Sequence, residues 1–510
     1  MFPQTLSPVA SSPRFHAIRT VAILLAWLAP ALCVVAPVAA QQPADAAAAE
    51  EKSVEGLAGT WQGALRVGPV ELRLVFRFEQ DDAGKLGGTL TSIDQTPTPI
   101  PLSAVQLADG QVTAAVAAIG GEFSGKLNED KSAIEGKWKQ SGSEFDLTVK
   151  RVAEAPAMKR PQEPKPPFPY DVEEVAFENS AAQITLAGTF TKPKGPGPHP
   201  AVVMITGSGP QDRDETVMGH KPFAVIADDL TLHGIAVLRF DDRGVGKSTG
   251  DFGAATHNDF VGDALAAVDW LKGRPEINAR QIGLIGHSEG GVVAPLAAVQ
   301  RPDDVAFIVI LAGVGVPMRE LLAQQGQDIG RTMGLSEASL ARDADVEGEF
   351  YDALRNDENL PTDELKQKLT DLIQGSLDEL SDEERDKLGV TPEVIKARVD
   401  AAVTPWFREL AMYAPGPTLE KVRCPVLALN GELDVQVAAD ANLNAISTAI
   451  ERGGNHDVTT LKLPGLNHLF QECETGSIAE YSRTEQTFAP AALEAVSGWI
   501  LKRVDARSAP

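Results

Sequence analysis

The 510-residue sequence predicts an α/β protein: a small antiparallel β domain, then a doubly wound, mostly parallel sheet with helices on both faces. Two observations lead to this prediction. In residues 56–152, apolar and polar residues alternate between Gly, Asp and Asn turns, which is typical of half-buried strands. Beyond residue 171, short apolar runs alternate with helical patterns, as expected for strands buried on both faces.

The first 40 residues are typical of an export signal. Arg14 and Arg19 precede a broken apolar stretch at 21–35, and Val38-Ala39-Ala40 supplies the small residues that a signal peptidase requires. We expect cleavage after about Ala40 and a periplasmic or extracellular protein. Prolines interrupt a stretch already shorter than the ~20 apolar residues that a membrane span needs, so no stable membrane anchor is expected.

Three segments follow the signal peptide. Residues 41–55 are rich in Ala and Glu and are expected to be flexible. Residues 56–152 form the predicted small all-β domain, a barrel or a sandwich. Residues 153–170 are rich in proline and predict a stiff, extended linker.

The second predicted domain covers residues 171–510. Helical patterns separate several of its apolar runs, which are at 201–207, 235–241, 282–286, 305–313, 426–431 and 458–464. Between about 316 and 418 no buried strand is expected, only acidic amphipathic helices. We interpret this stretch as a helical cap over the carboxyl ends of the strands, where open α/β sheets place their sites.

The sharpest motif is Gly286-His287-Ser288-Glu289-Gly290, between a predicted strand and a predicted helix. The glycines allow a sharp reversal of the chain, because side chains there would collide with neighbouring backbone. The reversal projects the serine hydroxyl above the sheet. Ser288 is therefore the predicted nucleophile.

A serine hydroxyl needs a base, and two histidines lie well downstream of Ser288. His456 precedes the strand at 458–464, which places it at the far edge of the sheet. His468 follows that strand and lies on the same edge as Ser288, so it is the predicted general base. His287 cannot fold back onto the adjacent serine and is expected to pack behind the turn.

The acid that orients the base is predicted by the same argument. Asp434 follows the strand at 426–431, and the chain order Ser288, Asp434, His468 is the order found in such sheets. Glu432 is the competing carboxylate, but it lies closer to the strand end. Two backbone N–H groups are expected to stabilise the oxyanion: that of Glu289, and that of Ser208 in the loop after 201–207.

Five motifs together resemble bacterial α/β-hydrolase esterases related to the serine aminopeptidase clan. They are Gly-His-Ser-Glu-Gly, residues 206–215 (TGSGPQDRDE), residues 240–250 (FDDRGVGKSTG), residues 431–437 and Asn467-His468. The resemblance implies the α/β-hydrolase fold, a carboxylic ester hydrolase with the triad named above, and a helical cap that shapes the acyl pocket. The β domain at 56–152 lies outside the resemblance.

These residues predict a two-step hydrolysis of a small to medium ester through an acyl-enzyme, with no cofactor. One alternative is a serine aminopeptidase that uses the same triad and holds an ammonium group with a carboxylate of the cap. Another is a ligand-binding protein in which the β domain captures a ligand and the hydrolase core is vestigial.

The composition narrows the possible partners. A net charge of −25 argues against nucleic acid as a partner, because binding it needs clustered Lys and Arg. No His, Cys or Asp cluster has metal-ligand spacing, so no metal is expected. Gly246-Lys247-Ser248 is similar to the end of a phosphate-binding loop, but Asp241 stands where that loop needs glycine. A small-molecule ester is the expected partner.

Overall fold

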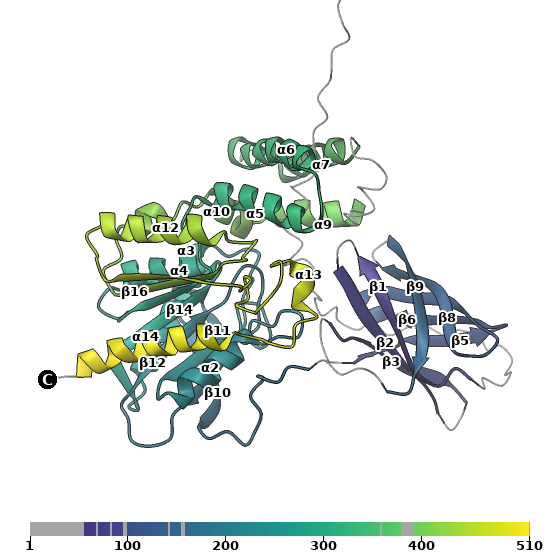
Figure 1. The fold of residues 1–510 in the computed structure, drawn as a ribbon, viewed down its shortest axis with the longest axis horizontal. Coiled ribbons are helices and arrows are strands. Elements are labelled where there is room, and N and C mark those ends of the chain that lie inside the picture. The colour runs from purple at the N-terminus through teal and green to yellow at the C-terminus, as the bar shows by residue number, and fades with distance from the viewer. Residues whose placement is uncertain are drawn as a thin grey trace, which may run out of the picture.

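The computed structural model describes residues 56–508, apart from 68–69, 82–83, 95–98, 141–142, 155–158, 358–359 and 379–391. The predicted signal peptide (1–40) and flexible segment (41–55) lie outside the described residues. Figure 1 shows two separate sheets, the first in purple and blue and the second in teal and green. Within the described ranges, no helix is both long and apolar enough to cross a membrane.

The first sheet has nine antiparallel strands in the order β4-β3-β2-β1-β9-β8-β7-β6-β5. It curves so that β3 and β5 come into contact, which makes it a half-barrel. The predicted small antiparallel β domain is confirmed. Its strands are β1 (Gly59–Val67), β2 (Val70–Gln80), β3 (Leu86–Ser92), β4 (Ile100–Pro101), β5 (Ala104–Ala108), β6 (Gln111–Val116), β7 (Gly121–Leu127), β8 (Ala133–Gln140) and β9 (Ser143–Val152).

Aromatic side chains fill the inside of this half-barrel. The Phe76 ring lies 5.7 Å from that of Phe78, 5.2 Å from that of Phe123 and 6.3 Å from that of Trp138, measured between ring centroids. Trp61 packs in the same buried cluster and donates its indole N–H to the Leu57 carbonyl at 2.8 Å. These rings are nearly inaccessible to solvent, so they form the packed core of the domain.

Several contacts join the first sheet and the linker to the second domain. In the linker, the Arg160 guanidinium donates to the carbonyls of Met218 and Thr484, both at 2.9 Å. Leu72 of β2 is buried in one apolar cluster with Met218 and with residues of α13 (Ile478–Tyr481). Figure 1 shows α13 between the two sheets. The first domain therefore packs against the second domain near Met218 and α13.

The second sheet has eight strands in the order β10-β11-β13-β12-β14-β15-β16-β17. The pairs from β13 to β17 are parallel, whereas β10 and β11 form an antiparallel edge that the sequence analysis did not predict. The strands are β10 (Asp171–Asn179), β11 (Ile184–Lys192), β12 (His199–Ile205), β13 (Ala236–Phe240), β14 (Ile277–His287), β15 (Ile308–Leu311), β16 (Val426–Gly431) and β17 (Val458–Leu463).

Helices cover both faces of this sheet, as predicted for a doubly wound domain. One face packs against α3 (His257–Lys272), α4 (Gly290–Gln300) and α12 (Ala439–Arg452). The other packs against α2 (Pro222–Leu232) and α14 (Pro490–Ser508). Because the central strands β12 to β16 are buried on both sides, they read as continuous apolar runs in the sequence.

A helical cap is inserted between β15 and β16 and lies over the carboxyl ends of the strands (Figure 1). Its position agrees with the insertion predicted at about 316–418. The described helices of the cap are α5 (Met318–Thr332), α6 (Glu337–Asn356), α7 (Thr362–Leu377), α9 (Pro392–Ala402) and α10 (Pro405–Met412).

We expect Phe76→Ala to reduce the free energy of unfolding of the first domain by about 3–5 kcal/mol, because it removes a fully buried ring from a packed cluster. Urea unfolding monitored by tryptophan fluorescence would measure the loss. The control is Arg66→Ala, which removes an exposed side chain of the same sheet and should cost less than about 1 kcal/mol. Equal effects of the two substitutions would contradict the assignment of this core.

Candidate active site

The turn between β14 and α4 carries Ser288 in a left-handed backbone conformation, with φ of +53°. A side chain on Gly286 would collide with the carbonyl of Gly290, and one on Gly290 would collide with the carbonyl of Ile205. The Ser288 N–H donates to the carbonyl of Leu311 at 2.9 Å. Close backbone contacts on both sides therefore hold this strained turn, and glycine is required at both positions.

His468 and Asp434 form a buried hydrogen-bonded pair. His468 Nδ1 lies 2.8 Å from the Asp434 Oδ2 atom, and the Asp434 side chain is inaccessible to solvent. Asp434 Oδ1 accepts hydrogen bonds from the N–H groups of Gln436 and Val437, at 2.8 and 2.9 Å. The carboxylate is thus held from both sides. It orients the imidazole so that Nε2 carries the lone pair.

The competing residues lie elsewhere. Glu432 is turned away from the histidine and accepts a hydrogen bond from the Gly465 N–H at 3.2 Å. His456 is exposed, in the loop before β17. Asp434 rather than Glu432 thus contacts the predicted base, and His468 rather than His456 lies beside Ser288.

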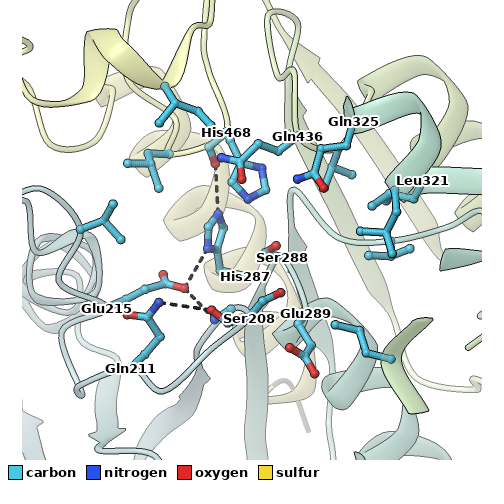
Figure 2. Close-up of a pocket in the computed structure, with 18 of the residues that line it drawn as sticks. Ser208, Gln211, Glu215, His287, Ser288, Glu289, Leu321, Gln325, Gln436 and His468 are labelled. Carbon is cyan, nitrogen blue, oxygen red and sulfur yellow. Dashed lines mark hydrogen bonds and ion pairs between the residues drawn. The ribbon is translucent and has the colours of Figure 1, made fainter. Parts of the chain in front are cut away.

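Ser288 and His468 line the same pocket, at the carboxyl ends of β14 and β17 (Figure 2). Within the described residues, no hydrogen bond joins the Ser288 hydroxyl to the His468 ring. Contacts of this kind commonly tighten only when the substrate complex forms. The structure therefore places the three predicted side chains at one edge of the sheet, with the Asp434–His468 contact already made.

The two predicted oxyanion donors also line this pocket. In the part of the chain that the structure describes, neither the Ser208 N–H nor the Glu289 N–H donates a hydrogen bond to a protein acceptor. Glu289 directly precedes α4, so its amide lies at the positive end of the helix dipole. Both amides are free to bind a developing negative charge.

Sequence reasoning missed the role of the Glu289 side chain. Its carboxylate accepts hydrogen bonds from Trp406 Nε1 at 2.9 and 3.2 Å, and it lies 3.2 Å from His257 Nε2. Trp406 belongs to α10 of the cap, so the residue after the predicted nucleophile fastens the cap to the core. A second bond joins Glu409 of α10 to the His257 N–H at 2.7 Å. The one feature of the sequence that could have indicated this contact is the tryptophan in the predicted cap.

A second missed contact lies beneath the nucleophile. The His287 ring is buried between the Glu215 carboxylate and the His468 carbonyl, in the place behind the turn where it was expected. Glu215 itself was not singled out, and nothing in its local sequence marks it as a partner of a residue 72 positions away.

Three acidic side chains gather around the turn. Glu215, Asp242 and Glu289 are all buried. Burial, together with the neighbouring carboxylates Glu289 and Glu215, raises the pKa of Asp242 well above its ordinary value, against hydrogen bonds from Thr206 and Gln211. Burial thus opposes ionisation of Asp242, while its two hydrogen-bond donors favour the carboxylate.

The rest of the pocket wall is mostly apolar. Helix α5 contributes Met318, Leu321 and Leu322, and α10 contributes Phe407 and Leu410. On the opposite side, Ile478 and Tyr481 of α13 complete the wall. Among the described residues, no group of three or more His, Cys, Asp or Glu side chains is arranged to hold a metal ion.

Parts of this chain are similar to known proteins. Residues 220–472 match the family described as serine aminopeptidase, S33. Esterase EstD of Thermotoga maritima is 35% identical over 159 residues, which is 31% of this chain and 38% of the relative. An uncharacterized protein of Mycobacterium tuberculosis is 32% identical over 158 residues, or 29% and 52% of the two chains. This chain thus spans about half or less of these relatives.

Two solved structures are similar to part of this chain at low identity. The esterase Est1E of Butyrivibrio proteoclasticus, with bound ferulic acid, has 19% identity and a TM-score of 0.38, over 65% of this chain and 99% of the other. An esterase of Pyrococcus furiosus has 17% identity and a TM-score of 0.39, over 66% and 91%.

The strand order, the turn at Ser288 between a parallel strand and a helix, the cap and the match over residues 220–472 lead to one conclusion. The second domain of this chain has the α/β-hydrolase fold, and it is similar to a bacterial esterase and to the serine aminopeptidase S33 family.

Proposed function

We propose that this protein is a serine hydrolase that cleaves a carboxylic ester through an acyl-enzyme intermediate. The observation that carries the proposal is the buried contact between His468 and Asp434 in the pocket that also contains Ser288. The carboxylate fixes the imidazole tautomer that a general base requires. The export signal expected at residues 1–40 would place this activity outside the cytoplasm.

In the first step, His468 Nε2 takes the hydroxyl proton of Ser288 while the oxygen attacks the acyl carbon of the ester. The N–H groups of Ser208 and Glu289 bind the oxyanion, and each such donor is typically worth about 3 kcal/mol in the transition state. The imidazolium then gives its proton to the leaving alcohol. In the second step, the same base activates water, which releases the acid and regenerates Ser288.

The pocket walls support an ester with an apolar acyl group. Leu321, Leu322 and Phe407 offer hydrocarbon surface next to the nucleophile. The two acidic side chains that line the pocket, Glu215 and Glu289, already accept hydrogen bonds from protein donors. They are therefore poorly suited to hold a substrate ammonium group.

A serine aminopeptidase is the second candidate function, because the matched family is described by that activity. It would use the same three side chains, and it differs only in the group that the cap must recognise. A non-catalytic binding protein is the third candidate, and it predicts that Ser288 is unreactive.

Ser288→Ala should abolish hydrolysis of a short p-nitrophenyl ester and labelling by a fluorophosphonate probe, because it removes the nucleophile. The melting temperature should remain close to that of the wild type. The control is Ser447→Ala on α12, which should keep full activity. Full activity in the Ser288 variant would exclude the proposed mechanism, and an unlabelled wild type would favour the binding protein.

Asp434→Asn should lower kcat on the order of 10³- to 10⁴-fold, because the amide no longer selects the required imidazole tautomer. Steady-state kinetics on the same ester would measure the effect. Glu432→Gln serves as the matched control, since Glu432 contacts the Gly465 amide and not His468. A larger loss in the Glu432 variant would reassign the acid.

A series of p-nitrophenyl esters of increasing acyl length, compared with aminoacyl p-nitroanilides, would separate the two enzymatic candidates. We expect esters to be preferred. Leu321→Trp should lower kcat/KM for the longer esters by about 10-fold or more, because it fills the apolar wall of the pocket. The control is Leu360→Trp, at an exposed position of the cap. Preference for an anilide with a free amine would instead support the aminopeptidase.

A further inference from the structure

The His287 ring connects two of the loops that surround Ser288. Its Nδ1 lies 2.9 Å from Glu215 Oε1, and its Nε2 lies 3.0 Å from the backbone oxygen of His468 (Figure 2). The ring is buried, and its centroid lies 4.8 Å from that of the His468 ring.

The partners of this ring determine its protonation. A carbonyl oxygen can only accept, so Nε2 carries a proton. Glu215 Oε1 also accepts the Gly207 N–H at 2.7 Å, an arrangement that favours a carboxylate facing a protonated Nδ1. The geometry thus favours an imidazolium at His287, paired with Glu215.

The surroundings of the ring agree with this charge. Burial would lower the pKa of His287, but the charge and hydrogen bond of Glu215 outweigh it and raise the pKa above its ordinary value. The His468 carbonyl and the Asp434 charge act in the same direction. Glu215, Asp434 and His468 are the titratable groups that face the ring from the loops packed against it.

Each end of this pair touches a different part of the proposed machinery. Gly207 precedes Ser208, whose N–H is the first oxyanion donor. His287 precedes Ser288 in the strained turn. The third contact is made by the backbone of His468 itself, the general base. One buried ion pair therefore spans the oxyanion loop, the nucleophile turn and the base loop.

We propose that the Glu215–His287 ion pair is a positioning device that holds the Ser208 amide and the His468 ring in register with Ser288. The proposal rests on the ester hydrolysis proposed above. Neither residue makes or breaks a bond with substrate. Buried ion pairs contribute little net stability, so stability alone does not account for this pair. The position of the pair between the three loops accounts for its presence.

Kinetics of Glu215→Gln and Glu215→Ala in the full chain would test the proposal. Gln keeps the oxygen that accepts both hydrogen bonds and removes only the charge, whereas Ala removes the pair. We expect kcat on a p-nitrophenyl ester to fall about 10-fold in the Gln variant and about 100-fold in the Ala variant, with KM little changed, because small displacements of catalytic groups have effects of this size.

The pH profile gives a readout that a purely structural role would not change. In the wild type, His287 stays protonated up to its raised pKa, and its deprotonation at higher pH breaks the pair. Without the Glu215 charge the pKa of His287 falls, so the alkaline decline of kcat should move to lower pH in the Gln variant. The control is Asp263→Asn. It neutralises a buried acid of α3 that pairs with Arg243, and it should leave this decline in place.

Wild-type kcat and an unshifted profile in both Glu215 variants would overturn the proposal, while an active wild type would leave the esterase assignment intact. A measurement on the wild type covers the case in which these variants do not fold. With ¹⁵N-labelled histidine, His287, assigned by a His287→Asn variant, should show two protonated ring nitrogens at pH 7. A neutral ring would overturn the proposal whether or not the protein hydrolyses esters.

Discussion

The close approach of strand β14 to helix α4 at Ser288 is the constraint on which the site depends. Gly286 and Gly290 allow backbone atoms to approach where any side chain would collide, and the reversal forces Ser288 into a left-handed conformation. The strain is sustained because the surrounding parallel strands are buried on both faces. The core of the sheet thus stabilises a turn that would not form alone, and the turn presents a hydroxyl at the sheet edge.

Several buried acidic side chains surround this turn. Glu215, Glu289 and Asp434 each accept hydrogen bonds from protein donors, and burial raises the pKa of Asp242. In such surroundings each hydrogen bond has a defined direction, because leaving a partner unsatisfied is costly. The hydrogen bonds therefore hold the loops in fixed relative positions, which is the preorganisation that the proposed acyl transfer would require.

The parts of this architecture that depend on local pattern could be predicted from the sequence. The strand β16 and the turn at Ser288 follow from apolar runs and paired glycines. The edge strand β10 was missed because it is mostly exposed and carries charged residues such as Glu173 and Glu174. Two contacts were missed because they join residues far apart in the sequence. The Glu215–His287 contact spans 72 positions and the Trp406–Glu289 contact spans 117, and both depend on how the loops and the cap pack.

The bond from Trp406 to Glu289 also bears on how the pocket responds to different substrates. Swinging α10 outward would strip a buried carboxylate of its indole donor, at a cost of about 1–3 kcal/mol. Enlargement of the cavity at that side is therefore opposed by the residue next to the nucleophile. If the pocket binds an acyl chain as proposed, a bulky chain could gain room on the α10 side only by breaking a contact to the residue after Ser288, so the size of the chain and the order of the turn are linked.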